Sequence, residues 1–145
     1  MWYNGLSPRT AKETSGGTKL SDYISLYEAI GGAPAVRDLV EKFYPKVQAD
    51  PLLSPLFPDD IHPVMEKQYL FLTQFFGGPS LYSDEFGHPM MRARHLPFPV
   101  TRSRAEAWLS CMARALSETA IPEPLHAVVL ERLSGPAHHF INTED

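Results

Sequence analysis

Four polar side chains stand out because helical spacing places them on otherwise apolar faces. They are Tyr44, Gln68, His95 and Trp108. Taken singly they are weak signals: a Tyr or Trp at helical spacing is most often core, and a lone His beside an apolar face is most often a hydrogen-bonded structural residue. Their combination indicates more than any one of them.

Together these residue types suit a flat apolar cofactor with a central iron. Such a cofactor needs one imidazole on one side, and hydrogen-bond donors without competing strong ligands on the other. His95 lies on a short segment between Pro89 and Pro97, and it suits the role of the single imidazole ligand. The Tyr44 hydroxyl, the Trp108 indole N–H and the Gln68 amide can each donate to a ligand with partial negative charge. The pattern favours His95 as a metal ligand.

A di-iron carboxylate bundle is the rival interpretation. Glu85 and His88, like Glu123 and His126, have the Glu-x-x-His spacing of that class. The first pair spans a glycine and is closed by a proline, so its carboxylate and imidazole cannot share one regular helical turn. Inward-facing Glu partners on two further helices are not evident. The single-imidazole site is therefore preferred.

Apolar residues at spacings of three and four predict helices along the first half of the chain. A short helix begins at Leu26 and ends at Gly31, which supplies a left-handed or unwound stop. A long amphipathic helix begins at Pro34 and carries an apolar face that includes Tyr44. Pro45 removes a backbone donor, so a kink or early unwinding is expected just after Tyr44.

A proline-rich corner separates this helix from the next. Five prolines lie between positions 45 and 63, so residues 50–58 cannot form a regular helix and are expected to pack inward as a corner. A third helix is predicted from about Asp60 to Phe76, with Gln68 interrupting its apolar stripe. A loop is predicted over residues 79–87.

The second half of the chain positions the remaining candidates. A short helix opened by Pro89 carries Met91 and His95 four residues apart. Thr101 is a predicted N-cap for a long helix whose apolar face includes Trp108. Each of the four candidate side chains therefore lies on a different predicted helix.

A last helix is predicted after Pro122, with a kink at residues 135–136, where Gly is followed by Pro. No segment shows sustained period-two alternation, so the predicted fold class is all-α, with six or seven helices. The 145 residues suit one domain. Residues 1–22 are rich in small and polar types and are expected to form a flexible N-terminal tail, with the domain over residues 23–145.

Composition excludes several classes of protein. Thirteen Lys and Arg against seventeen Asp and Glu give a net charge of −4, and no basic run points to a nucleic-acid partner. No stretch approaches the roughly 20 apolar residues of a membrane helix. The one cysteine, Cys111, cannot close an intramolecular disulfide, and its apolar setting favours a buried structural thiol over a nucleophile. These features predict a protein of the reducing cytoplasm.

Five separated motifs agree in order and spacing with one known family. They are Tyr27-Glu28-Ala29-Ile30-Gly31-Gly32, Phe43-Tyr44, the run from Pro51-Leu52-Leu53 to Leu56-Phe57-Pro58, Phe71-Leu72-Thr73-Gln74 before Gly77-Gly78-Pro79, and Gly87-His88-Pro89-Met90-Met91-Arg92-Ala93-Arg94-His95. In these motifs the chain resembles the truncated haemoglobins, and among them group II, from about Leu26 to Asn142. The resemblance implies a globin-like fold, a truncated 2-on-2 helical sandwich around haem b.

The resemblance also implies roles for single residues. His95 matches the proximal iron ligand, and Tyr44, Gln68 and Trp108 match polar residues of the distal pocket. Val64 stands where many globins have a distal histidine, which implies a five-coordinate ferrous iron. The residues implied to contact the cofactor are Phe57, Lys67, Leu72, Met91, Arg94, His95, Phe98 and Trp108, with Lys67 and Arg94 near the haem propionates.

Three functions follow as expectations. The first is reversible binding of oxygen and other small diatomic ligands at the iron, by a monomer or a homodimer. The second is redox catalysis at the same iron, peroxidase-like or as a nitric oxide dioxygenase, with an unidentified reductase. The third is a haem-free globin-like interaction module, which the buried donors disfavour because unsatisfied polar groups are costly without a ligand.

Overall fold

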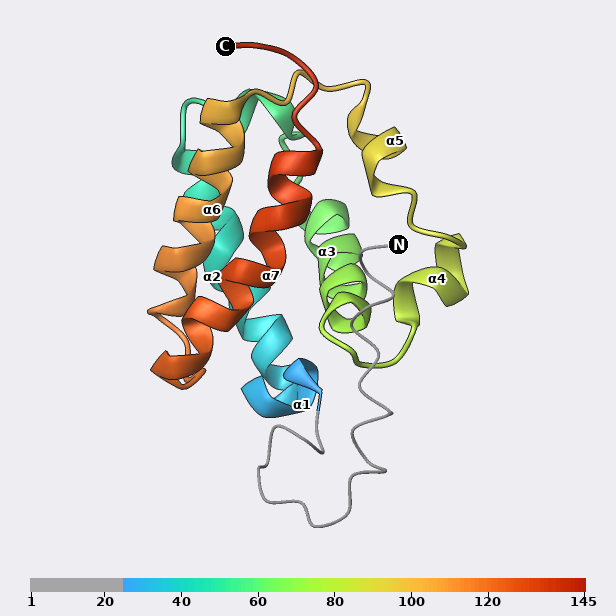
Figure 1. The fold of residues 1–145 in the computed structure, drawn as a ribbon, viewed down its shortest axis with the longest axis vertical. Coiled ribbons are helices and arrows are strands. Elements are labelled where there is room, and N and C mark those ends of the chain that lie inside the picture. The colour runs from blue at the N-terminus through green and yellow to red at the C-terminus, as the bar shows by residue number, and fades with distance from the viewer. Residues whose placement is uncertain (1–24) are drawn as a thin grey trace.

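The computed structural model describes residues 25–145, without the side chain of Arg92, and the predicted tail lies outside this range. The described chain is helical throughout and contains no strand. Its elements are α1 (Leu26–Ile30), α2 (Gly32–Ala49), the 3-10 turn η4 (Ser54–Leu56), α3 (His62–Phe75), α4 (Leu81–Phe86), α5 (Met91–His95), α6 (Arg102–Leu116) and α7 (Glu123–His139) (Figure 1). The all-α prediction is confirmed.

The helices pack mainly as the pairs α6–α7, α2–α6, α2–α3, α3–α4 and α1–α2. The core lies where α2, α3, α6 and α7 meet, and side chains such as Leu39, Leu72, Met112 and Val129 are fully buried there. The short helix α5 belongs to none of these main pairs and stands beside the rest in the ribbon view (Figure 1). No helix within residues 25–145 is long and apolar enough to cross a membrane.

Local signals in the sequence explain most helix ends. Ser25 and Glu28 form a reciprocal capping box at the start of α1, and Gly31 ends that helix with a φ of 120°, a conformation that favours glycine. The Thr101 hydroxyl accepts a hydrogen bond from the Arg104 amide at 3.1 Å, which confirms Thr101 as the N-cap of α6. These helix ends were predictable because each depends on residues close in sequence.

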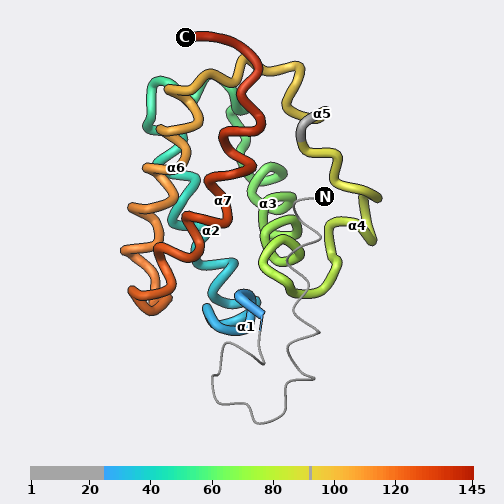
Figure 2. Tube along the Cα trace, in the orientation of Figure 1, coloured from blue at the N-terminus to red at the C-terminus, as the bar shows by residue number. Residues whose placement is uncertain are grey.

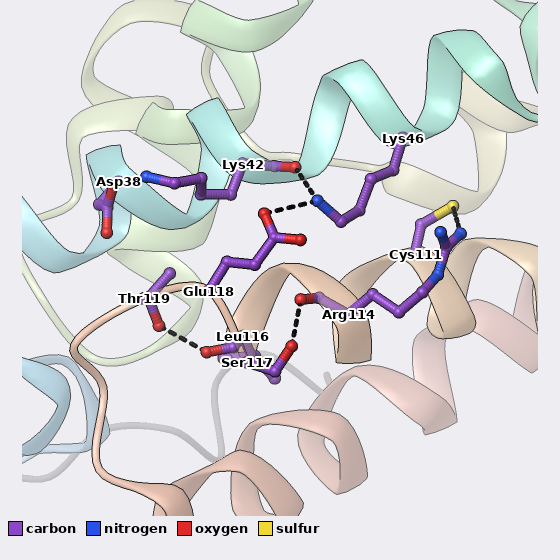
Figure 3. A network of polar contacts seen from close by, with 9 residues as sticks. All are labelled: Asp38, Lys42, Lys46, Cys111, Arg114, Leu116, Ser117, Glu118 and Thr119. Atoms are coloured by element: carbon purple, nitrogen blue, oxygen red, sulfur yellow. Dashed lines mark hydrogen bonds and ion pairs between the residues drawn. The ribbon is translucent and has the colours of Figure 1, made fainter.

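The early unwinding predicted at Pro45 is wrong, because α2 continues through Pro45 to Ala49. Val47, two residues further on, is fully buried, and Lys46 forms an ion pair with Glu118 at 2.8 Å (Figure 3). These contacts hold the last turn of α2 against α6. They offset the backbone hydrogen bond that the proline removes.

One further expectation about the helices needs correction. The last helix α7 runs through Pro136 to His139, so residues 135–136 do not end it, and the kink expected there stays a prediction. The predicted loop over residues 79–87 instead contains α4. The Gln74 Oε1 atom accepts a hydrogen bond from the Ser83 amide at 2.9 Å, and the Gln74 Nε2 atom donates one to the Ser83 hydroxyl at 2.8 Å. Gln74 thus connects α3 to α4 through contacts that no local sequence pattern reveals.

Candidate functional site

His95 is the last residue of α5, and its imidazole is held from within that helix. Its Nδ1 atom lies 2.7 Å from the carbonyl oxygen of Met91, one turn earlier. Since a carbonyl only accepts, Nδ1 carries the proton and Nε2 keeps its lone pair. Burial lowers the pKa of His95 below its ordinary value, which favours the neutral ring near pH 7. The arrangement presents Nε2 as a metal-ligating atom.

The four-residue spacing of Met91 and His95 places the Met91 carbonyl within hydrogen-bonding distance of the imidazole. The carbonyl bond sets both the tautomer and the rotation of the imidazole, which is what metal-ligating histidines ordinarily require from their surroundings. The side chain of Met91 is half-buried and packs against the hydrophobic core.

A cluster of aromatic rings surrounds Tyr44 on α2. Tyr44 is only 2% exposed, and its ring meets Phe43 edge-on at 4.8 Å and Phe57 edge-on at 6.1 Å between centroids. Phe43 in turn meets Trp108 of α6 at 5.1 Å. The structure thus links Tyr44 of α2 directly to Phe57 in the corner after that helix, and through Phe43 to Trp108 of α6.

The three predicted donors keep their hydrogen-bonding capacity. Within residues 25–145, no hydrogen bond engages the Tyr44 hydroxyl, the Gln68 amide or the Trp108 indole. Burial raises the pKa of Tyr44, so its phenol stays protonated and remains a donor. These groups are suited to a ligand that the chain itself does not supply.

The α3 residues line up along one helix face at spacings of four. Val64 and Gln68 are half-buried, and Leu72 is fully buried within the core. Val64 is apolar, so this position offers no ligating atom. The only polar side chain of the three is that of Gln68.

Lys67 and Arg94 are both exposed and both lie over aromatic rings of α4. The Lys67 ammonium is 5.1 Å from the Phe86 ring centroid, and the Arg94 guanidinium is 5.7 Å from that of Tyr82. Tyr82 and Phe86 are themselves 5.0 Å apart. Arg94 also donates from Nε to the Pro89 carbonyl at 2.7 Å. Two cations from distant parts of the sequence therefore share one small helix.

Three large apolar side chains near His95 remain outside the core. Met90, Leu96 and Phe98 are 58%, 53% and 46% exposed, respectively. They flank α5 on both sides in sequence, and exposed apolar side chains often occur at ligand or interaction sites. The chain thus leaves exposed apolar side chains close in sequence to the predicted metal ligand.

Sequence reasoning missed the residues that contact His95 from the C-terminal end. The Phe140 ring is nearly parallel to the imidazole, 4.3 Å away with an 11° angle between planes. The Asn142 side chain donates to the carbonyl oxygens of His95 at 3.2 Å and Phe98 at 2.9 Å. More than 40 residues separate these partners in sequence, so no spacing could have revealed them.

The di-iron alternative finds no support in this geometry. Glu85 lies in α4, which ends at Phe86, so His88 lies beyond the helix. In the described part of the chain, no group of three His, Cys, Asp or Glu side chains is placed to hold a metal ion. A site with one histidine ligand remains.

Comparison with known proteins identifies the fold. The family model of the bacterial-like globins matches residues 25–142. A group 2 truncated haemoglobin of Bacillus subtilis is 48% identical over 116 residues, which are 80% of this chain and 87% of that protein. The chain belongs to the group II truncated haemoglobins.

Solved structures of this family agree with that assignment. The group II truncated haemoglobin of Bacillus anthracis is 50% identical, has a TM-score of 0.82, and matches over 84% of this chain and 99% of its own. A truncated oxygen-avid haemoglobin from Bacillus subtilis is 47% identical, with a TM-score of 0.78, over 82% of this chain and 100% of its own. The resemblance inferred from sequence motifs is confirmed.

Proposed function

We propose that this truncated haemoglobin holds haem b with His95 as the protein ligand to iron, and that it binds oxygen and other small diatomic ligands. One observation carries the proposal: the neutral His95 ring donates from Nδ1 to the Met91 carbonyl and so leaves Nε2 as a ligand. The group II relatives support it, including the oxygen-avid haemoglobin of Bacillus subtilis.

The residues present fit a haem. Its apolar faces would be held by side chains from five parts of the chain: Phe57, Leu72, Met91, Phe98 and Trp108. Phe98 is 46% exposed, and a bound haem would cover such a surface. Lys67 and Arg94 are cations suited to the propionates. When bound, haem supplies an iron that takes a diatomic ligand or exchanges an electron.

The remaining polar residues would act on the ligand. Tyr44, Gln68 and Trp108 offer hydrogen-bond donors that no described residue uses, and donors of this kind stabilise partial negative charge on oxygen. Val64 contributes no imidazole, so the iron would be five-coordinate in the ferrous state. The chain would orient and retain the ligand through these donors.

The family match argues against a haem-free interaction module. The chain matches the bacterial-like globin model over residues 25–142, and a relative that is 48% identical over 116 residues is a truncated haemoglobin. The aromatic rings around Tyr44 and the exposed apolar side chain of Phe98 also suit a flat apolar cofactor.

Spectroscopic oxygen titration of the ferrous protein, purified with haem available, tests this function. We expect saturable binding that reverses when oxygen is removed. Peroxide or nitric oxide is then added with a reductant in separate reactions, and its consumption is followed. Sustained turnover of either substrate, without reversible oxygen binding, would place the protein among haem redox enzymes instead.

A further inference from the structure

The helix that carries His95 has little structural support of its own. α5 has five residues, and isolated helices of fewer than about 12 residues are marginal in water. It begins at Met90 with a φ of 46°, a left-handed conformation that is unusual for a residue with a side chain, and it has no side-chain cap. It belongs to none of the main helix pairs. Contacts from elsewhere must therefore fix its position.

Phe140 provides the first of these contacts. It follows the last turn of α7, and its ring lies 4.3 Å from the imidazole of His95 at an interplanar angle of 11°. The Met91 carbonyl provides a restraint from within α5, because its hydrogen bond to Nδ1 limits rotation of the imidazole about its side-chain bonds. The ring stack and this hydrogen bond together define the plane of the imidazole.

Asn142 provides the second contact, and both the nitrogen and the oxygen of its side-chain amide form hydrogen bonds. Its Nδ2 atom donates to the His95 carbonyl at 3.2 Å and to the Phe98 carbonyl at 2.9 Å. Its Oδ1 atom accepts from the Val100 amide at 3.0 Å. Its backbone amide donates to the Val100 carbonyl, also at 3.0 Å. One side chain therefore fastens the whole turn that leaves α5.

The chain path explains how these contacts arise. After α7 the C-terminal segment crosses to the loop between α5 and α6 (Figure 2). Beyond Asn142, the Asp145 carboxylate accepts from the Ser103 hydroxyl at 2.9 Å, which attaches the end of the chain to the first turn of α6. The segment thus links the proximal loop to two helices of the core.

We propose that Phe140 and Asn142 form a C-terminal clasp that sets the orientation of the His95 imidazole and thereby slows haem loss. Both are positioning residues, since they act through His95. The inference rests on the proposed function, in which His95 binds iron. Residues that orient a metal ligand typically change metal affinity by about 10-fold to 100-fold when they are replaced.

Isosteric and conservative variants separate orientation from general packing. Asn142→Asp keeps the size and the acceptor for Val100, but it turns two donated hydrogen bonds into contacts between oxygen atoms. Phe140→Leu removes the flat ring, whereas Phe140→Tyr retains it. Ser103→Ala is the matched control, because it weakens the attachment of the same terminal segment without touching α5.

The readouts are the iron–histidine stretching band of the ferrous protein in resonance Raman spectra, and the rate of haem transfer to an excess of apomyoglobin. Asn142→Asp and Phe140→Leu should shift the band and accelerate haem loss by about 10-fold to 100-fold. Phe140→Tyr should keep the band at its wild-type position, because the flat ring is retained. Ser103→Ala should leave the band position and the rate of haem loss unchanged.

An unshifted band with wild-type haem loss in either Asn142→Asp or Phe140→Leu would overturn the clasp. Should Asn142→Asp fail to fold, as judged by circular dichroism, the comparison of Phe140→Leu with Phe140→Tyr decides alone. A wild-type protein that binds haem without any iron–histidine band would instead overturn the proposed function. The two failures are thus distinguishable.

Discussion

Replacing Tyr44 with Phe tests the distal side of the site with the smallest change that the structure allows. The substitution removes one oxygen atom and keeps a ring that packs edge-on against Phe43 and Phe57. Trp108→Phe is less selective, because the indole also packs on Phe43 at 5.1 Å. A change on Tyr44→Phe therefore reports on the hydroxyl.

The expected magnitude follows from the state of that hydroxyl. The Tyr44 side chain is 2% exposed, and its hydroxyl donates no hydrogen bond to any of the described residues. A hydrogen bond to a charged acceptor contributes about 1.5 to 3 kcal/mol net. At about 1.4 kcal/mol per decade, Tyr44→Phe should speed oxygen dissociation by roughly 10-fold to 100-fold. Carbon monoxide carries less negative charge on its outer atom, so its dissociation should change much less.

Stopped-flow ligand replacement on the ferrous protein measures both rates. Tyr69→Phe is the control, because it removes a phenol hydroxyl from a ring that packs under Arg37 at 3.8 Å. The haem-free Tyr44→Phe protein should melt close to wild type, since the substitution keeps the ring that packs against Phe43 and Phe57. Equal changes for both gases would mean that the substitution acts through packing or access. The proposed donor role of Tyr44 would then be refuted.

Three further predictions concern the scaffold. The Lys46–Glu118 ion pair should show a coupling free energy of about 0.2 to 1 kcal/mol, because both side chains are partly solvated. A double-mutant cycle measured by urea unfolding tests this, and a coupling above about 2 kcal/mol would contradict it. Thr101→Ala should lower the free energy of unfolding by about 1 kcal/mol, since the Arg104 amide loses its cap, and an unchanged urea midpoint would count against the cap. Burial raises the pKa of Cys111, so its thiolate is scarce at pH 8 and should react with a thiol reagent only in denaturant; rapid labelling of the native protein would show that the thiol is accessible.

The sequence revealed those features that depend on near neighbours. Gly31 ends α1 and Thr101 caps α6 through contacts within three residues, and both were predicted. The Met91–His95 pair follows from one turn of helix. Tyr44, Gln68 and Trp108 could be singled out for a similar reason, because each interrupts the apolar face of its own predicted helix, and their role toward a ligand stays a prediction.

The errors arose where distant contacts override local preference. Pro45 does not end α2, because Val47 beyond it is buried and Lys46 reaches Glu118, 72 residues away in sequence. α4 was missed because Gln74 holds it through Ser83. The contacts of the C-terminal segment with the His95 loop were invisible for the same reason.

The most direct test of the central claim is the absorption spectrum of the protein purified with haem, recorded ferric, ferrous and with carbon monoxide, for wild type and His95→Gly. Wild type should show the three spectra of a histidine-ligated haem. His95→Gly should lose its haem, or retain it only when free imidazole is added, because the proposed protein bond to iron is absent. A His95→Gly protein with the wild-type ferrous spectrum, in the absence of imidazole, would contradict the account.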